Sequence, residues 1–148
     1  MLRNKPLDMQ LIQLLGKDAR QSSEALASQL NVSSATVRRR VKKLIKSGVL
    51  RIVAVADPAK VGLPLAVVIA LRVNPESSAS VVNLLTSRPE IKWVSTTTGR
   101  FDLIALARFA STDELSEFVQ TDLPSIGGIR NSETFVCLRV LKPPYTQI

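Results

Sequence analysis

The stretch 33–48, SSATVRRRVKKLIKSG, constrains the fold of this chain more than any other. It holds six of the seven Lys and Arg residues in the interval 25–56, and that interval contains no Asp or Glu. Its aliphatic residues fall at i, i+4, i+7 and i+8, the spacing of one helical stripe. The pattern predicts an amphipathic helix with a cationic outer face. The aliphatic positions are Val37, Val41, Leu44 and Ile45.

Both ends of this predicted helix carry residues that commonly begin or end helices. Ser33 or Ser34 can accept a hydrogen bond from an unpaired N–H at the start, and Gly48 can adopt the left-handed conformation that closes a helix. Small first-turn residues let a helix approach base edges, while Arg and Lys neutralise phosphates or bond guanine. A solvated basic face is the plainer interpretation. Contacts to double-stranded DNA are expected from Ser33, Ser34, Thr36, Arg38, Arg39, Arg40, Lys42 and Lys43.

Two shorter apolar faces precede the basic helix. Residues 20–30 predict a helix capped near Ser22, followed by a turn of about three residues, as a helix-turn-helix requires. An earlier leucine-rich face, beginning at Leu7, stops at Gly16. Three short helices whose third is basic are typical of a DNA-binding domain.

An ordered set of residues runs through this first part of the chain. It comprises Leu7-Asp8, Ile12, Leu15, Asp18-Ala19-Arg20, Glu24-Ala25-Leu26-Ala27, Val32-Ser33, Thr36-Val37, Arg40-Val41, Leu44 and Gly48-Val49-Leu50. The set resembles the N-terminal half of the Lrp/AsnC (feast/famine) transcriptional regulators. Arg40 matches a family position, but it flanks the apolar stripe, where it is also placed to pair with an acid on the first helix.

Charge divides the 148 residues into two parts. Residues 1–60 contain twelve Lys or Arg and four Asp or Glu, whereas residues 61–148 contain eight of each, so the whole excess of +8 lies in the first part. A basic first part joined to a neutral second part predicts that one domain binds a polyanion. An anionic membrane surface is the less favoured polyanion, because the apolar faces lack the Trp and Phe of interfacial helices.

Several classes of site and location are disfavoured by composition. The chain has no His and one Cys, Cys137, which disfavours a metal site and precludes an intrachain disulfide; no cofactor is expected. The longest apolar run, 63–71, falls short of the ~20 residues of a transmembrane helix. The N-terminus shows no signal-peptide core, so we expect a cytoplasmic protein.

The segment 49–56 is rich in β-branched residues and predicts a strand, bounded by Asp57-Pro58. Such an apolar segment is unlike a free linker, and we expect it to pair with the same strand of a second subunit. In the resembling family two chains meet at this place. Half of a winged-helix hairpin is the monomeric alternative. We therefore expect a DNA-binding domain at 1–49, a linker strand and bend at 50–64, and a second domain at 65–148.

The second part predicts strands at 65–73, 91–98, 103–110 and 129–141, ended by the segment 142–145. Two helices separate them: one begins with Asn74 as cap and Pro75 as first helical residue, and one opens with a capping box at 111–114. The order βαββαβ is that of a ferredoxin-like fold, which makes the chain α+β. Both faces of the first strand are apolar, so a second copy is expected to cover the open face and form a homodimer. Family members often assemble further, into tetramers or octamers.

The turn at 98–102, Thr-Gly-Arg-Phe-Asp, looks like the effector loop of the family's ligand domain. Gly99 allows backbone angles that expose amides to a carboxylate, and Asp102 can pair with an ammonium, so the two suit an amino acid. A hairpin turn in which Asp102 only caps the loop is the structural alternative. Arg100-Phe101 departs from the tyrosine or small residue of many members. Effector contacts are expected from Thr98, Gly99, Arg100, Phe101, Asp102 and Thr134.

These features predict a sequence-specific transcriptional regulator, not an enzyme, that responds to an amino acid or related effector. A nucleoid-compacting protein that ignores metabolites is one alternative. An enzyme similar to the sirohaem decarboxylases is another, but those proteins depend on histidine, which this chain lacks.

Overall fold

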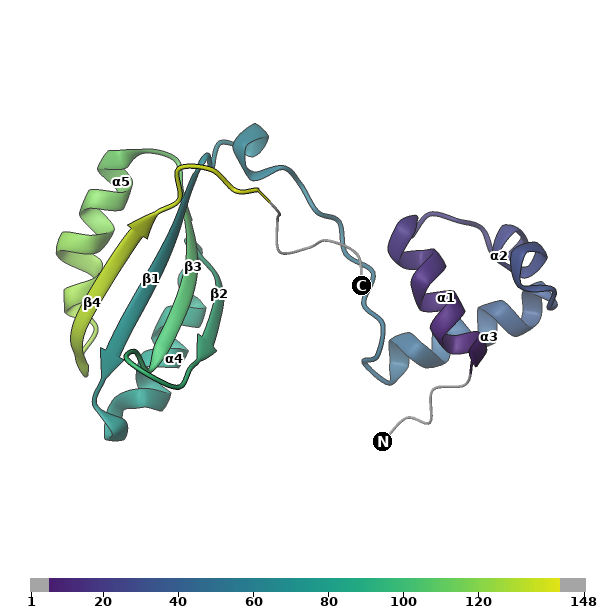
Figure 1. Ribbon diagram of the computed structural model, residues 1–148, viewed down its shortest axis with the longest axis horizontal. Helices are drawn as coiled ribbons and strands as arrows, with labels where there is room; N and C mark the ends of the chain where they lie inside the picture. The colour runs from purple at the N-terminus through teal and green to yellow at the C-terminus, as the bar shows by residue number, and fades with distance from the viewer. Residues whose placement is uncertain (1–5, 142–148) are drawn as a thin grey trace. The chain divides into compact units, whose positions relative to one another are not determined.

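The computed structural model describes residues 6–141 (Figure 1). These residues form two compact units that divide between Val55 and Ala56. The first unit holds three helices and the second a four-stranded sheet with its own helices, which confirms the α+β prediction. The predicted stop at 142–145 lies outside the described residues.

The first unit begins and ends its helices where local chemistry dictates. The Ser22 hydroxyl accepts from the Ala25 N–H, and the Ser33 hydroxyl accepts from the Thr36 N–H, so serine caps open the second and third helices. Gly48 has φ +72°, the left-handed conformation expected of it. The helices are α1 (Pro6–Lys17), α2 (Ser23–Leu30) and α3 (Ser34–Lys46).

A small leucine core joins these three helices. Leu11 of α1 and Val37 of α3 have no exposed surface, and Leu26 of α2 is 2% exposed. Leu15 and Ala27 complete the buried cluster. Because α3 contributes only its aliphatic stripe to this core, its remaining faces stay at the surface.

The second unit is a ferredoxin-like sheet, as predicted. Its strands follow the order β2-β3-β1-β4, and every neighbouring pair is antiparallel. The central strand β1 is nearly continuous in burial, which fits a strand that is hydrogen-bonded on both sides. The bounds are β1 (Leu65–Val73), β2 (Ile91–Thr96), β3 (Leu103–Phe109) and β4 (Ile129–Val136).

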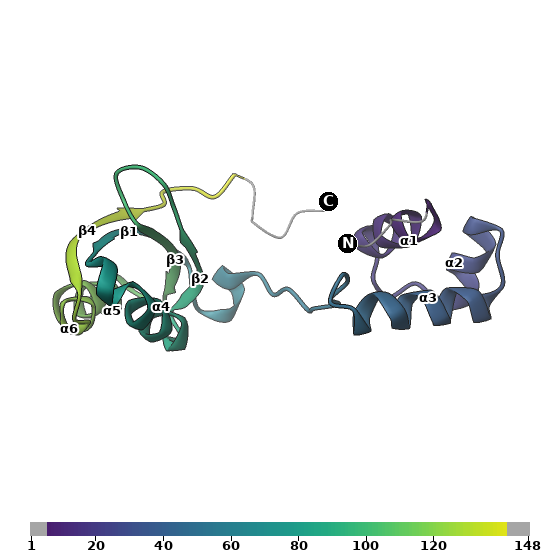
Figure 2. The same ribbon diagram turned by 90° about the horizontal axis from the view of Figure 1, so that it is seen from below.

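Helices cover one face of this sheet and leave the other open (Figure 2). The covering segments are α4 (Ser78–Ser87) and α5 (Thr112–Glu117), the latter continuing through a π-helical turn, Phe118–Asp122, into the short α6 (Leu123–Ser125). Phe118 packs on Phe109 of β3 with ring centroids 5.3 Å apart. The core of the unit therefore lies between the helices and the sheet.

The segment 51–57 has no regular secondary structure in the single chain, where its backbone has no ladder partner, so its pairing with a second subunit stays a prediction.

Two local predictions are wrong. The strand predicted over 129–141 stops at Val136, one residue before the Cys137 N–H makes a last bond to the Ala66 carbonyl. The helix predicted from Pro75 begins at Ser78 after a 3-10 turn. The Asn74 side chain forms no capping hydrogen bond, and the backbone N–H of Asn74 donates to the Gly128 carbonyl at 2.8 Å.

Gly128 supplies a sharp stability prediction for this unit. Its φ is +98°, and a Cβ there would lie 2.3 Å from the Cβ of Ser77. Gly128→Ala should lower the free energy of unfolding by roughly 2–4 kcal/mol through strain and overpacking, measured by urea unfolding followed through Trp93 fluorescence. Gly127→Ala is the matched control, since a Cβ at Gly127 meets nothing within 4 Å. Equal stability of the two variants would contradict this account.

Candidate nucleic-acid interface and ligand loop

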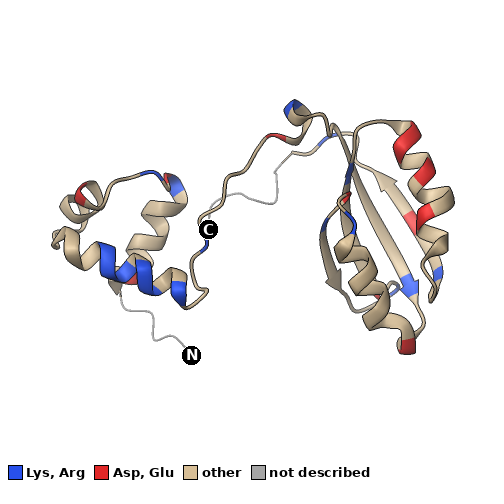
Figure 3. Cartoon of the chain, turned by 180° about the vertical axis from the view of Figure 1, so that it is seen from behind, with Lys and Arg blue, Asp and Glu red and all other residues tan. Residues whose placement is uncertain are grey.

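Lys and Arg residues are concentrated along α3 (Figure 3), and several of them are exposed and unpaired in the described part of the chain. Within residues 6–141, the ion pairs found involve none of four exposed Lys and Arg side chains of this helix. Unpaired cations on one helix face are available to phosphates. They are Arg39, Lys42, Lys43 and Lys46.

Arg38 differs from these four because it has an acidic partner. Its Nη1 lies 2.9 Å from Oε1 of Glu24, in the first turn of α2, and both side chains are more than half exposed. A backbone hydrogen bond at Glu24 itself lowers the pKa of that carboxyl; desolvation opposes this effect, and Ser22 and Arg38 reinforce it. Because its pKa is lowered, this carboxylate is charged at neutral pH. Its hydrogen bond to Arg38 places it against α3. Sequence reasoning missed this pair, since its members are 14 residues apart and no local pattern joins them.

Arg40 lies on the opposite flank and binds within the unit. Its Nη1 lies 3.3 Å from Oδ1 and 3.4 Å from Oδ2 of Asp8, on α1. The Arg40 side chain is 20% exposed and that of Asp8 13%. The alternative role of Arg40, pairing with an acid on the first helix, is thus present, and this pair joins α3 to α1.

The three hydroxyl residues at the start of α3 are not equivalent. The Ser33 hydroxyl lies 2.9 Å from that of Thr36 and also accepts from the Thr36 N–H. Ser34 and Thr36 are half-buried, whereas Ser33 is exposed. The cap therefore fixes the first turn of the helix and orients the Thr36 hydroxyl.

A shallow hollow of about 470 Å³ lies between the start of α2 and the second half of α3. Two aliphatic and three cationic side chains line it, a combination suited to a sugar–phosphate chain. The sequence indicated the cations but not the hollow, because it depends on how α2 packs on α3. Its lining is Ser23, Arg38, Val41, Lys42, Ile45 and Lys46.

In the second unit, backbone hydrogen bonds fix the loop at 97–102. The Thr97 N–H bonds to the Asp102 carbonyl at 2.9 Å, and the Thr97 hydroxyl donates to the Phe101 carbonyl at 2.8 Å. Asp102 Oδ2 accepts from the Val73 N–H at 2.9 Å, which ties the loop to the end of β1. Gly99 has φ +105°, a conformation that other residues avoid.

Charged side chains surround this loop. Arg100 donates to Glu133 of β4 at 2.6 Å, and its guanidinium carbon lies 5.3 Å from the centre of the Phe101 ring. Arg72 donates to the Arg100 carbonyl at 2.7 Å, and Arg130 lies 3.9 Å from Asp102 Oδ2. The sequence placed Arg100, Phe101 and Asp102 in one loop, but Arg72, Arg130 and Glu133 join them only through strand pairing.

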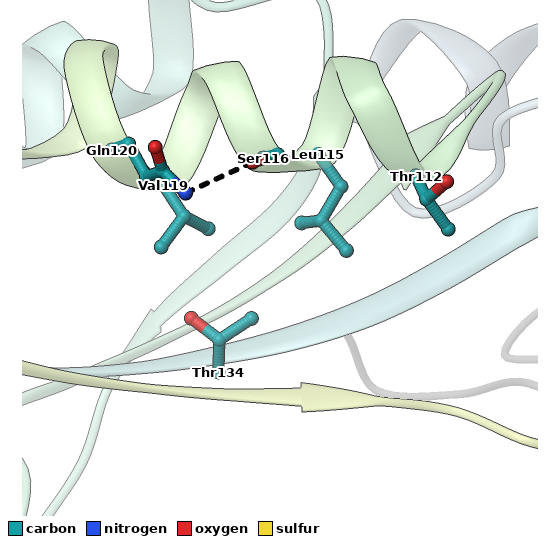
Figure 4. Close-up of a pocket in the computed structure, with 6 residues that line it drawn as sticks. All are labelled: Thr112, Leu115, Ser116, Val119, Gln120 and Thr134. Carbon is teal, nitrogen blue, oxygen red and sulfur yellow. Dashed lines mark hydrogen bonds between the residues drawn. The ribbon is translucent and has the colours of Figure 1, made fainter.

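Thr134 lies elsewhere in this unit. It pairs with Ile69, on the face of the sheet that the helices cover, and Glu133 beside it points the other way. The structure therefore does not bring Thr134 together with the 98–102 loop within one chain. Thr134 faces α5 across a pocket of about 260 Å³ (Figure 4), lined also by Thr112, Leu115, Ser116, Val119 and Gln120.

Comparison with known proteins matches both units. Residues 5–51 match a winged helix-turn-helix DNA-binding domain, and residues 66–146 match the Lrp/AsnC ligand binding domain. The chain belongs to the Lrp/AsnC family. It is a DNA-binding transcriptional regulator of that type, with a ligand-binding domain.

Relatives of similar length support this membership. An uncharacterised HTH-type transcriptional regulator of Pyrococcus furiosus is 34% identical, over 96% of this chain and 97% of the relative. One from Pyrococcus abyssi is 32% identical, over 96% and 90%. Both relatives are named as transcriptional regulators.

Solved structures share the fold. AsnC of E. coli has a TM-score of 0.89 at 23% identity, covering 96% of this chain and 97% of that one. A transcriptional regulator of Neisseria meningitidis, solved as a complex with L-Met, has a TM-score of 0.88 at 22% identity, covering 95% and 93%.

Residues 6–141 lack two further features. No helix within 6–141 has the length and apolar character needed to cross a bilayer. In the same residues, no three His, Cys, Asp or Glu side chains gather as metal ligands would.

The Arg40–Asp8 pair predicts a stability effect in this family member. Arg40→Ala should lower the free energy of unfolding by roughly 1–3 kcal/mol, because it leaves the largely buried Asp8 carboxylate without its cation. Urea unfolding by circular dichroism measures the change, and hydrogen exchange of α1 peptides locates it. Arg39→Ala, an exposed neighbour, should shift stability by less than about 0.5 kcal/mol. Equal effects of the two substitutions would show that the pair is not structural.

Proposed function

We propose that this regulator binds specific DNA sequences by placing α3 in the major groove, and that an amino acid binding to its second unit modulates that binding. The unpaired cations of α3 carry the first part of the proposal. Arg39, Lys42 and Lys43 project from the helix without an acidic partner in residues 6–141. Ser34, Thr36 and Arg38 stand on its first turns, where base edges are read.

Dimerisation is the second part of the proposal. Ile52, Val53 and Val55 are 49–60% exposed, although burying apolar side chains of this size is energetically favourable. The open face of the sheet presents a further apolar row, whose outer members Trp93 and Phe135 are 52% and 51% exposed. Pairing of the 49–56 segments and contact between open faces in two copies would bury both surfaces. A symmetric dimer also presents two α3 helices to two half-sites.

The effector assignment depends on the loop at 97–102. Asp102 uses one oxygen to fix β1, yet a carboxylate has about four acceptor sites and retains capacity for an ammonium. Arg130, 3.9 Å from Asp102, and Arg100, which is paired with Glu133, supply guanidinium groups that suit a carboxylate. The L-Met complex of the Neisseria regulator supports an amino acid as the ligand class. Effector binding would act by shifting the balance between oligomeric states, from dimers to tetramers or octamers.

Two other functions are weaker candidates. A nucleoid protein would use the same cations but ignore metabolites, and the match of residues 66–146 to a ligand binding domain favours an effector instead. An enzyme of the sirohaem decarboxylase type would need histidine, and the whole sequence has none. The relatives are named as regulators, which favours regulation over catalysis.

The DNA assignment predicts the effect of removing two cations. Arg38→Ala plus Arg39→Ala should weaken duplex binding at least about tenfold near 100 mM salt, and should flatten the slope of log K against log salt by about 0.9 for each phosphate that is no longer neutralised. Fluorescence anisotropy with a duplex enriched from a random pool measures both. Lys17→Ala plus Arg20→Ala removes the same charge from exposed positions outside α3 and should have less effect. Unchanged affinity in the α3 variant would rule out this helix as the contact surface.

The effector assignment predicts a selective loss at Asp102. Asp102→Asn retains an oxygen that can accept from the Val73 N–H, but removes the charge that an ammonium would meet. Titration calorimetry across the protein amino acids should identify a ligand for the wild type, and Asp102→Asn should bind it at least about tenfold more weakly. Asp113→Asn, an exposed acid of α5, is the control. An absence of heat for every amino acid with the wild type would favour the nucleoid alternative.

A further inference from the structure

Glu24 is an acidic side chain beside the cationic helix, and its placement is unexpected for a surface that meets a polyanion. Its Oε1 lies 2.9 Å from Nη1 of Arg38, and the Glu24 side chain is 68% exposed. A carboxylate held there repels phosphates that approach α3 from the α2 side. An exposed ion pair contributes little to folding stability, so stability alone does not explain why Glu24 is paired with Arg38.

Comparison with Asp8 separates two roles for acids beside α3. The Asp8 carboxylate is 13% exposed and its partner Arg40 20%, so this pair belongs to the packing between α1 and α3. Arg38 is 58% exposed, and both members of its pair are accessible to a bound duplex. Among the described Lys and Arg residues of α3, Arg38 is thus the exposed residue that already has an acidic partner.

The geometry of a guanidinium allows Glu24 to orient Arg38 without occupying all of its donors. Arginine has five N–H donors in a fixed plane, and Glu24 engages Nη1, leaving Nη2 and Nε. Bidentate bonding to guanine O6 and N7 uses two donors and does not require Arg38 to leave Glu24. Binding a phosphate non-specifically, by contrast, either draws the guanidinium away and leaves the carboxylate facing a polyanion, or brings the phosphate close to that carboxylate.

We infer that Glu24 is a specificity-determining residue: it orients Arg38 toward base edges and weakens binding that depends on phosphate contacts alone. The inference rests on the proposed function, because it presupposes that α3 reads DNA. The partner it concerns is double-stranded DNA, and the discrimination is between sequences with and without a guanine within reach of Arg38.

The test uses the full-length protein and four variants: Glu24→Gln, Asp18→Asn, Arg38→Ala, and Glu24→Gln combined with Arg38→Ala. Asp18→Asn is the matched control, since it removes one negative charge from the same unit at a residue whose cation is Arg20, outside α3. Each protein selects from a random pool of duplexes of about 30 base pairs, roughly three helical turns. Affinities for one enriched and one unenriched duplex are then measured between roughly 50 and 300 mM salt.

Glu24→Gln should bind the unenriched duplex about three- to tenfold more tightly than the wild type, with a salt slope steeper by about 0.9, the value of one added phosphate contact. The ratio of enriched to unenriched affinity should fall by a similar factor, and the preference for guanine at one position should weaken. Asp18→Asn should change the ratio less than about twofold. In the Arg38→Ala background, Glu24→Gln should no longer change the ratio.

Two results would overturn the inference alone while the wild type still binds DNA selectively. One is equal effects of Glu24→Gln and Asp18→Asn, which would indicate a general field effect. The other is an unchanged specificity ratio in Glu24→Gln. A wild type that retains no duplex, or retains all duplexes equally, would overturn sequence-specific binding itself, and with it the role of Glu24.

Discussion

Repulsion among like charges is the constraint on which the first unit depends. α3 places six Lys and Arg residues in 13 positions with no acid of its own. Such a helix is held by its neighbours, through the burial of Val37 and Leu44 and through the acids Asp8 and Glu24 on its two flanks. The buried stripe fixes which face turns outward, so the same contacts that stabilise the helix also present its remaining cations to solvent.

Features that depend on neighbouring residues could be predicted from the sequence. The helical spacing around Val37, the serine caps at Ser22 and Ser33 and the left-handed Gly48 all follow from chemistry within a few residues. The order of strands and helices in the second unit followed in the same way, because alternating turn signals and apolar runs are also local. Local chemistry therefore specified the elements and the fold class.

Features that depend on distant contacts could not be predicted. The segment 49–56 has the composition of a strand, but composition supplies no ladder partner, and in the single chain its backbone has none. The Glu24–Arg38 pair and the contact of Glu133 with Arg100 join residues 14 and 33 positions apart. Thr134 lies beside α5 because its register with Ile69 turns it to the helix side, and a shift of one residue would reverse that.

Ligand selectivity would arise in a different way in each of the two units. In the first unit, binding strength comes from charge that is already exposed, so discrimination requires something that weakens unwanted contacts, and an acid beside Arg38 has that effect. In the second unit, the loop carboxylate and guanidinium groups are already engaged with one another, through Arg100 with Glu133 and Arg130 with Asp102. Under the proposed function, a ligand there would compete with these pairs or use the acceptor sites that they leave free. Selectivity in both units would then follow from pre-existing ion pairs, which only a well-matched partner can use or displace at a net gain.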